Sequence, residues 1–350
     1  MHRIRRIGFL HFFVFTQSRG QDKTPKPVPA SNECLHHMAI GTFAYASHSQ
    51  RFLACEPLVQ QPFAVMGVPF DGAVTHRTGA RMGPQAIRTA SLMLCDGIHP
   101  HFNVSPLDHV GDAGDMRLPN TLGLAEVRPH IEAQALQLMQ QHHPVFLGGD
   151  HSITLSLLRA ARQRQRQLGN DQPLALLHFD AHCDTWVDHF GEPSGHGTWV
   201  YEAIQEGLVD PKRTVQVGLR SSGQREAREY VQDQGGVIAT ARDLRGLDGM
   251  GLQGWLGVVR QRLSGSPCYL SLDIDVLDPA FAPGTGTPEP GGLTSSQMLT
   301  FMEGLADLPW VGMDCVEVAP AYDHADLTTH AAATLVWTYL SGQVAKAQGL

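Results

Sequence analysis

Residues 174–185, Leu-Ala-Leu-Leu-His-Phe-Asp-Ala-His-Cys-Asp-Thr, constrain the fold of this chain more than any other stretch. An apolar run of the length of a buried strand ends in three side chains that can bind metal: Asp180, His182 and Asp184. If extended geometry continues through them, alternate side chains point to one face. Two carboxylates and an imidazole suit Mn²⁺, Fe²⁺ or Zn²⁺ better than a thiolate-preferring ion. A polar turn after a strand is the alternative interpretation, and this motif alone does not decide between the two.

Two other apolar runs end in the same kind of residue. Residues 269–275 finish with two aspartates at alternate positions, and residues 144–151 pass through a Gly-Gly turn to an aspartate and a histidine. Six ligands are too many for one ion but suit two ions that share carboxylates and activate water between them. The three runs together therefore predict a two-metal site. The candidate ligands are His151, Asp180, His182, Asp184, Asp273 and Asp275.

The order of apolar and amphipathic segments indicates the fold class. From about residue 60, short apolar runs alternate with segments of helical length, which is typical of a parallel sheet covered by helices. The candidate ligands then fall at the carboxyl ends of strands, where open α/β sheets bind their ligands. Since the sequence has no internal repeat or interior linker, we expect one α/β domain over residues 51–350. Strands are expected at residues 63–67, 107–110, 144–147, 214–218, 235–238 and 311–317, and in the runs that begin at residues 174 and 269.

Composition limits the classes of partner and the compartment. The formal net charge of −8 argues against nucleic acid and mildly favours a cationic substrate. No apolar run is long enough to span a bilayer, so we expect no membrane partner. The six cysteines are scattered without a C-x-x-C pair, which in a chain of 350 residues indicates reduced thiols and a cytoplasmic location.

Residues 1–50 differ from the rest of the sequence. Four basic residues before the apolar run 7–15 superficially resemble a targeting peptide, and residues 24–31 are rich in proline. Three interpretations compete: a targeting segment, a flexible extension, or residues upstream of a true start at Met38. We favour a flexible N-terminal extension, because the composition that follows is typical of a cytosolic protein.

Five motifs follow the predicted strands. They are Gly-Gly-Asp-His at 148–151, Asp-Ala-His-Cys-Asp at 180–184, Ser-Leu-Asp-Ile-Asp-Val-Leu-Asp-Pro at 271–279, Pro-Gly-Thr-Gly-Thr-Pro at 283–288 and Glu-Val-Ala-Pro at 317–320. Together the motifs resemble the ureohydrolase family of arginases and agmatinases, over about residues 60–345. The resemblance implies a single three-layer α/β/α domain with a mostly parallel eight-stranded sheet. It also implies assembly into homo-oligomers, usually trimers or hexamers.

The same resemblance implies a role for each site residue. Glu317 would pair with the substrate guanidinium, and His196 would carry a proton to the departing amine. Asp150 would orient a ligand, while Thr287 and Asp278 would lie near the substrate or stabilise their loop. One Mn²⁺ would be held by His151, Asp180, Asp184 and Asp273. The second Mn²⁺ would be held by Asp180, His182, Asp273 and Asp275, so that Asp180 and Asp273 bridge the ions.

The subfamily resemblance is closer to agmatinases, which implies hydrolysis of agmatine to putrescine and urea in polyamine biosynthesis. Residues 186–196, beside the expected site, offer Asp188 and Glu192 as partners for a cation and contain no Arg or Lys. The alternative is an ω-guanidino acid substrate such as guanidinobutyrate or guanidinopropionate, for which Arg77 or Arg81 could supply a cation. A one-zinc deacetylase-like enzyme and an inactive relative that binds without catalysis are two further hypotheses.

Overall fold

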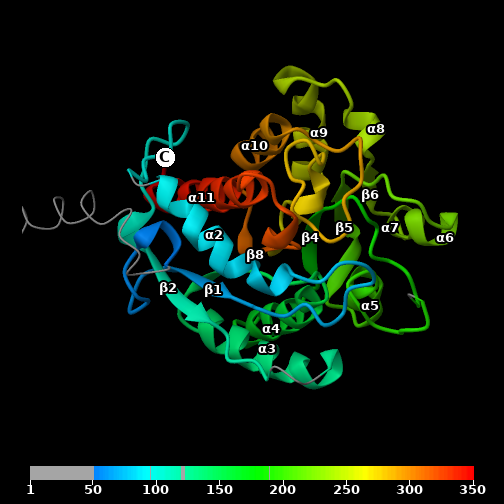
Figure 1. Ribbon diagram of the computed structural model, residues 1–350, viewed down its shortest axis with the longest axis horizontal. Helices are drawn as coiled ribbons and strands as arrows, with labels where there is room; N and C mark the ends of the chain where they lie inside the picture. Colours follow the sequence, from blue (N-terminus) through cyan, green and yellow to red (C-terminus); the bar gives the residue numbers. More distant parts are fainter. Residues whose placement is uncertain (1–50, 95, 120–122, 189) are drawn as a thin grey trace, which may run out of the picture. The chain divides into compact units, whose positions relative to one another are not determined.

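An eight-stranded, wholly parallel sheet organises the chain in a computed structural model that describes residues 51–94, 96–119, 123–188 and 190–350 (Figure 1). Its strand order is β2-β1-β3-β8-β7-β4-β5-β6. The sequence-based prediction of a parallel sheet is therefore confirmed. The strands are β1 (Phe63–Gly67), β2 (Val110–Asp115), β3 (His143–Leu147), β4 (Leu174–Phe179), β5 (Val209–Val217), β6 (Val237–Ala239), β7 (Cys268–Asp273) and β8 (Trp310–Val316).

Helices cover both faces of the sheet and complete a single three-layer α/β/α domain (Figure 1). One face is covered by α2 (Gly83–Ser91), α9 (Gly249–Leu263), α10 (Ser295–Gly304) and α11 (Leu327–Gln348). The opposite face is covered by α3 (Leu124–Met139), α4 (Ile153–Gln167) and α5 (Trp199–Gln205). Three short helices, α6 (Arg225–Arg228), α7 (Tyr230–Asp233) and α8 (Ala241–Leu244), lie between β5 and α9 in the sequence.

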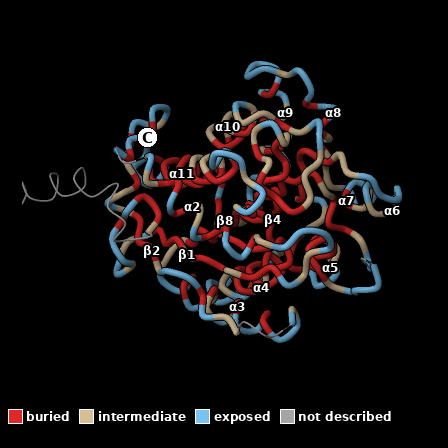
Figure 2. The backbone as a smooth tube through the Cα atoms, in the orientation of Figure 1, coloured by how far each residue is buried: buried red, intermediate tan, exposed pale blue. Residues whose placement is uncertain are grey.

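Successive side chains of the central strands point to opposite faces of the sheet, which divides the hydrophobic core in two. Phe146 packs toward α3 and α4, whereas its neighbour Leu147 packs toward the other helical layer, and both are fully buried. Central strands are buried on both faces, which explains why they appear in the sequence as continuous apolar runs. Figure 2 shows the buried residues concentrated along the sheet and the inner sides of the helices.

The second strand differs from its prediction. Residues Leu107–His109 form a short 3₁₀ turn, and β2 begins only at Val110. The Gly- and Asp-rich residues 111–115, beyond the predicted strand, form most of this edge strand. Asp112 accepts backbone N–H bonds from Phe52 at 2.8 Å and from Gly114 at 2.8 Å. It also binds a buried arginine, which offers a charge partner that sequence analysis did not identify.

Replacement of that arginine, Arg88 on α2, should have a large effect on stability. Its guanidinium donates to Asp112 at 2.8 and 2.9 Å and to Asp115 at 2.5 Å, and Arg88 is 3% exposed. Arg88→Ala leaves the Asp112 carboxylate buried without its cation and should lower the free energy of unfolding by about 3–5 kcal/mol. Urea denaturation measures this. Arg166→Ala, which breaks an exposed pair with Asp171, is the control and should cost less than about 1 kcal/mol. Equal losses would contradict the assignment.

Three sequence-based expectations concern features outside the sheet. Residues 1–50, including the candidate start Met38, lie outside the described residues, so the N-terminal extension stays a prediction. The four described cysteines are free and buried, whereas Cys34 and Cys95 are not described. Within the described ranges, no helix is both long and apolar enough to cross a bilayer.

Candidate functional site

The register of the sheet brings the predicted site residues to one edge. Leu147 pairs with Cys315, Cys315 with Leu272, Leu272 with Phe179, and Phe179 with Val217. These residues form one row across the ends of β3, β8, β7, β4 and β5. The residues that follow the row therefore emerge side by side. Five of the eight predicted site residues follow this row at the ends of β3, β4, β7 and β8: His151, Asp180, Asp273, Asp275 and Glu317. The other three, His182, Asp184 and His196, lie farther along the loop after β4.

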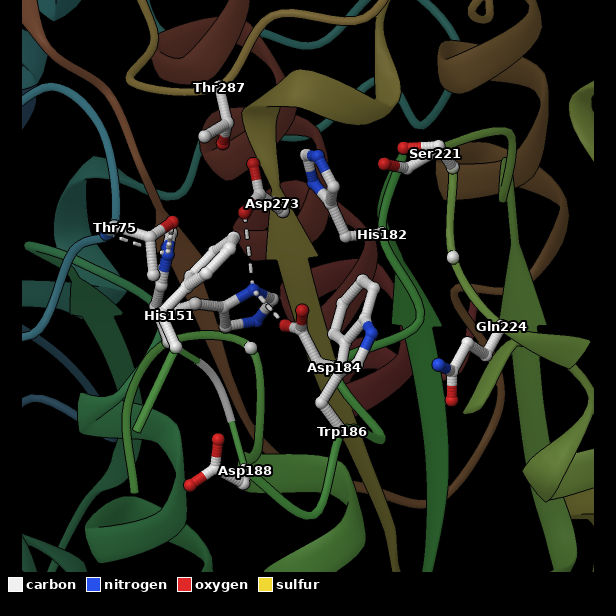
Figure 3. A pocket seen from close by; sticks show the side chains of 15 residues that line it. Thr75, His151, His182, Asp184, Trp186, Asp188, Ser221, Gln224, Asp273 and Thr287 are labelled. Atoms are coloured by element: carbon white, nitrogen blue, oxygen red, sulfur yellow. Dashed lines mark hydrogen bonds and ion pairs between the residues drawn. The ribbon is translucent and has the colours of Figure 1, made fainter. Parts of the chain in front are cut away.

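The first group of candidate ligands surrounds one nitrogen of His151. Its Nδ1 lies 3.1 Å from Asp180 Oδ2, 3.2 Å from Asp184 Oδ2 and 3.2 Å from Asp273 Oδ2 (Figure 3). Although three carboxylate oxygens are this close, the buried Nδ1 has no hydrogen-bond partner among the described residues. Four converging ligand atoms with an unbonded imidazole nitrogen among them fit a divalent cation better than a hydrogen-bonded cluster.

A second group lies on the other side of Asp180. His182 Nδ1 is 3.2 Å from Asp180 Oδ1 and 3.1 Å from Asp275 Oδ2. Asp180 therefore faces one group with each oxygen, which would suit a carboxylate shared between two ions. Asp273 contributes Oδ2 to the first group, and its Oδ1 accepts the backbone N–H of Asp275 at 2.8 Å. The structure thus brings all six predicted ligands together, and their binding of metal stays a proposal.

The ligands after β4 converge by a turn, not by continued strand geometry. The strand ends at Phe179, and Asp184 adopts a left-handed conformation with φ of 52°. The expectation that residues 180–184 alternate as an extended strand is therefore wrong. Helix α5 holds the turn: Trp199 Nε1 donates to Asp184 Oδ2 at 2.6 Å, and the Val200 N–H donates to the Asp184 carbonyl at 3.0 Å.

A second row of buried polar residues crosses the sheet one residue before the strand-end row described above, and it contacts the candidate ligands. Asp314, Ser271, His178 and Gln216 are register partners on β8, β7, β4 and β5. Ser271 Oγ lies 2.8 Å from His151 Nε2 and donates to Asp314 at 2.7 Å, so the opposite ring nitrogen of His151 is the one that faces the carboxylates. His178 Nε2 lies 2.8 Å from Asp180 Oδ2. This row orients the ligands, as the outer partners of metal-bound side chains do.

The charge of the cluster also favours cations. Burial and the neighbouring carboxylates of Asp275 and Asp180 raise the pKa of Asp273 well above its usual range. Burial alone would lower the pKa of His151, but the close carboxylates of Asp180, Asp184 and Asp273 hold it well above the usual value. Without metal the cluster therefore takes up protons, and binding of divalent cations should release them.

His196 and Glu317 lie next to the first group. His196 Nδ1 is 3.2 Å from Glu317 Oε1, and its Nε2 is 2.8 Å from the hydroxyl of Thr75. Glu317 Oε1 also accepts the backbone N–H of His151 at 2.9 Å. Burial lowers the pKa of His196, but the hydrogen bond and charge of Glu317 outweigh it and raise the pKa above the ordinary value. Sequence analysis did not identify Thr75, which stands in a loop without any motif.

Two glycines make this packing possible. A Cβ on Gly149 would lie 1.7 Å from the carbonyl oxygen of Phe70, so the turn before His151 needs glycine there. A Cβ on Gly286 would lie 2.9 Å from the carbonyl oxygen of Arg77 and 3.6 Å from Glu317 Oε2. The Gly-rich motifs at 148–151 and 283–288 therefore let backbone approach the site closely.

A cavity of about 510 Å³ opens above the candidate ligands (Figure 3). His151, His182, Asp184 and Asp273 lie on its inner side. Its described lining includes one further acid, Asp188, and contains no Lys or Arg. The rest of the wall is formed by Thr75, Trp186, Phe190, His196, Gly197, Ser221, Ser222, Gly223, Gln224 and Thr287.

Of the four charged residues considered for the far end of a substrate, Asp188 alone lines the cavity, and Glu192 does not. The Arg77 guanidinium stacks on the Tyr322 ring at 5.0 Å, and Arg81 pairs with Asp71. Neither arginine lines the cavity, which removes the sequence-based argument for a bound carboxylate.

The remaining candidates have mostly structural contacts. Asp150 accepts the Ala73 N–H at 2.8 Å and so ties the loop after β1 to the site, while burial and then the charge of Glu317 raise its pKa to about 6. Asp278 accepts backbone N–H bonds from residues 280, 291 and 292 and stabilises its own loop. Cys183 is buried and belongs to neither ligand group, so its role is packing.

Comparison with known proteins identifies the family. The sequence model described as the Arginase family matches residues 61–341. The chain belongs to the arginase family. Among its family relatives, the agmatinase of Chromobacterium violaceum is 40% identical over 277 residues, which are 77% of this chain and 80% of that protein. The agmatinase of Salmonella typhi is 42% identical over 303 residues, which are 83% and 92% of the two chains.

Solved structures of family members share the fold. A hypothetical agmatinase from Burkholderia thailandensis superposes with a TM-score of 0.78 and 37% identity, over 88% of this chain and 94% of that one. Proclavaminate amidino hydrolase from Streptomyces clavuligerus gives a TM-score of 0.77 and 34% identity, over 87% and 99%. The arginase from Bacillus caldovelox gives a TM-score of 0.64 and 28% identity, over 80% and 98%.

Proposed function

We propose that this member of the arginase family is an agmatinase, which hydrolyses agmatine to putrescine and urea. The observation that carries the proposal is the cavity itself. It joins two groups of metal-binding side chains to a wall that has an acid, Asp188, and no Lys or Arg among its described residues. Such a wall suits a substrate with a positive charge at both ends. The similarity to proteins named agmatinase supports the same substrate.

Two Mn²⁺ ions are the proposed cofactors, because hard carboxylate oxygens and imidazoles dominate both ligand groups. Bound there, they would activate a water molecule for attack on the guanidinium carbon. His151, Asp180, Asp184 and Asp273 would hold one ion. Asp180, His182, Asp273 and Asp275 would hold the other.

The protein's own residues would bind the substrate and move the proton. Glu317 is buried and is not among the residues that line the cavity, but it contacts His196, which does line it. Because a carboxylate pairs well with a planar guanidinium, Glu317 would orient that group toward the ligand cluster. His196, held between Glu317 and Thr75, would donate a proton to the departing amine nitrogen. The Trp186 and Phe190 rings would exclude water from the apolar part of the substrate chain.

Assembly and location are part of the proposal. We expect a homo-oligomer, trimer or hexamer, on the family resemblance stated above. A reducing, cytosol-like compartment fits the scattered cysteines, four of which are described as free thiols.

Agmatine should be preferred to related guanidino compounds. A carboxylate at the far end of guanidinobutyrate or arginine would lose hydration against Asp188 without gaining a cation, which costs on the order of 1–3 kcal/mol. We therefore expect kcat/KM for agmatine to exceed that for arginine and for guanidinobutyrate by at least about tenfold.

A urea-release assay across agmatine, arginine, guanidinobutyrate and guanidinopropionate tests this preference in the Mn²⁺-loaded protein. Asp188→Asn should lower the ratio of kcat/KM for agmatine to kcat/KM for guanidinobutyrate. Glu192→Gln, outside the cavity, should leave this ratio unchanged. A higher kcat/KM for a guanidino acid would overturn the agmatinase assignment in favour of the alternative.

A further inference from the structure

The loop that carries His196 is attached to helix α5 through one carboxylate. Glu202, in the first turn of α5, accepts a hydrogen bond from Thr198 Oγ1 at 2.6 Å. The Ser194 hydroxyl lies 2.8 and 2.9 Å from its two carboxylate oxygens. Ser194 and Thr198 stand on either side of His196, at two residues' distance each. A single side chain therefore fixes both flanks of the 194–198 loop.

Other contacts make this attachment stiff. Thr198 Oγ1 accepts the Gly195 N–H at 2.9 Å, which closes a compact turn directly before His196. Arg128 on α3 approaches the same carboxylate, with Nη1 3.4 Å from Glu202 Oε2. The Glu202 side chain is 18% exposed and that of Arg128 is 10% exposed, so solvent competes weakly for either. Charge-assisted hydrogen bonds of this kind are stronger than neutral ones.

The position of His196 depends on this loop. Its ring must reach Glu317 with Nδ1 and Thr75 with Nε2 at the same time, and its backbone N–H reaches the Ala73 carbonyl at 3.2 Å. These partners come from the end of β8 and from the loop after β1, not from the 194–198 loop. A shift of the loop along α5 would therefore move the ring away from both of its partners together.

From these contacts we propose that Glu202 is a positioning residue for the reaction. It holds the 194–198 loop so that His196 stays between Glu317 and Thr75, in reach of the departing amine. The inference rests on the proposed function, because it assigns to His196 the proton transfer of that reaction. Misplacement of a catalytic group by about 1 Å can cost up to about a hundredfold in rate.

The alternative is that Glu202 only stabilises the start of α5, whose N-terminal residues also hold Asp184. The two roles differ in what they change. A merely structural role would lower stability or metal content and would affect rate whether or not His196 is present. A positioning role acts on kcat through His196 alone.

The experiment is a double-mutant cycle of Glu202→Gln and His196→Asn in the full, Mn²⁺-loaded chain. We expect Glu202→Gln to lower kcat about tenfold, with KM within about twofold and two metal ions per chain. In the His196→Asn background the same substitution should change kcat by less than about twofold. Glu206→Gln is the matched control, because it removes an ion pair with Arg159 near the end of α5 without touching the loop. It should leave kcat unchanged.

Either of two results would overturn the proposal. One is an equal fall in kcat on Glu202→Gln with and without His196, and the other is loss of bound metal in Glu202→Gln.

If the wild-type protein fails to hydrolyse agmatine, the proposed function fails at that step. The cycle then uses whichever guanidino compound is cleaved, and the crystal structure of Glu202→Gln decides the positioning role without turnover. We expect His196 Nδ1 to have left Glu317 in that structure, and an unchanged contact would contradict the proposal.

Discussion

Asp273→Asn should abolish most of the activity, lowering kcat by at least about 10³-fold and reducing bound metal below one ion per chain. Asp273 Oδ2 joins the first ligand group, and its Oδ1 orients Asp275 in the second through the backbone N–H. An amide supplies one neutral oxygen and cannot bridge two cations as a carboxylate does. His151→Asn removes a ligand from one group only, so we expect smaller losses of activity and metal there.

Metal analysis after dialysis and urea release after Mn²⁺ reloading measure both variants. Asp278→Asn is the control on the same loop, because its carboxylate binds backbone N–H groups outside both ligand groups. It should retain two ions and kcat within about threefold. Equal residual activity and metal content in Asp273→Asn and His151→Asn would contradict the bridging role.

Glu317→Gln should lower kcat/KM for agmatine by about 10²–10³-fold while two metal ions stay bound. Glu317 is 1% exposed and belongs to neither ligand group, so under the proposed function its charge would serve the substrate and His196, not the metals. Removing one partner of a buried, hydrogen-bonded charge pair costs about 2–5 kcal/mol, which spans this range of rate.

Steady-state kinetics and metal content of the same preparation test the role of Glu317. Since glutamine keeps the size and one hydrogen-bond acceptor, the backbone N–H of His151 can still be satisfied. Loss of metal in Glu317→Gln would mean that the residue supports the ligand cluster. Activity within about fivefold of wild type would mean that another group holds the guanidinium.

The central strands, and the gathering of the candidate ligands at one edge of the sheet, could be predicted from the sequence for the same physical reason. A strand buried on both faces must be continuously apolar, so the polar residues that follow it stand out. His151, Asp180 and Asp273 each follow or end such a run, and parallel strands bring their carboxyl ends to one edge of the sheet. Candidate site residues whose positions are determined by the sheet could therefore be identified from the sequence.

Features created by packing between distant segments could not be predicted. Strand β2 has no apolar run, because it is an edge strand whose Asp112 binds Arg88 of α2. Thr75 and residues 221–224 reach the cavity only through the folded positions of their loops. The supporting pair Ser271 and Asp314 lies inside strands, where a buried polar residue carries no local signal of the partner that it will meet.

The turn at Asp184 illustrates the same limit at a single residue. Alternate spacing of residues 180, 182 and 184 suggested one face of a strand, yet the chain turns and Asp184 takes a positive φ of 52°. The structure brings the candidate ligands together, although the extended geometry considered for them was wrong. Local pattern identified the residue types, whereas tertiary contacts with Trp199 and Val200 determine the conformation.

The most direct test of a two-metal guanidinium hydrolase is a titration of the metal-free protein with Mn²⁺, followed by urea release from agmatine. We predict negligible urea release without metal and a rate that reaches its plateau only at two Mn²⁺ per chain. A plateau at one ion per chain, or full activity in the metal-free protein, would contradict it.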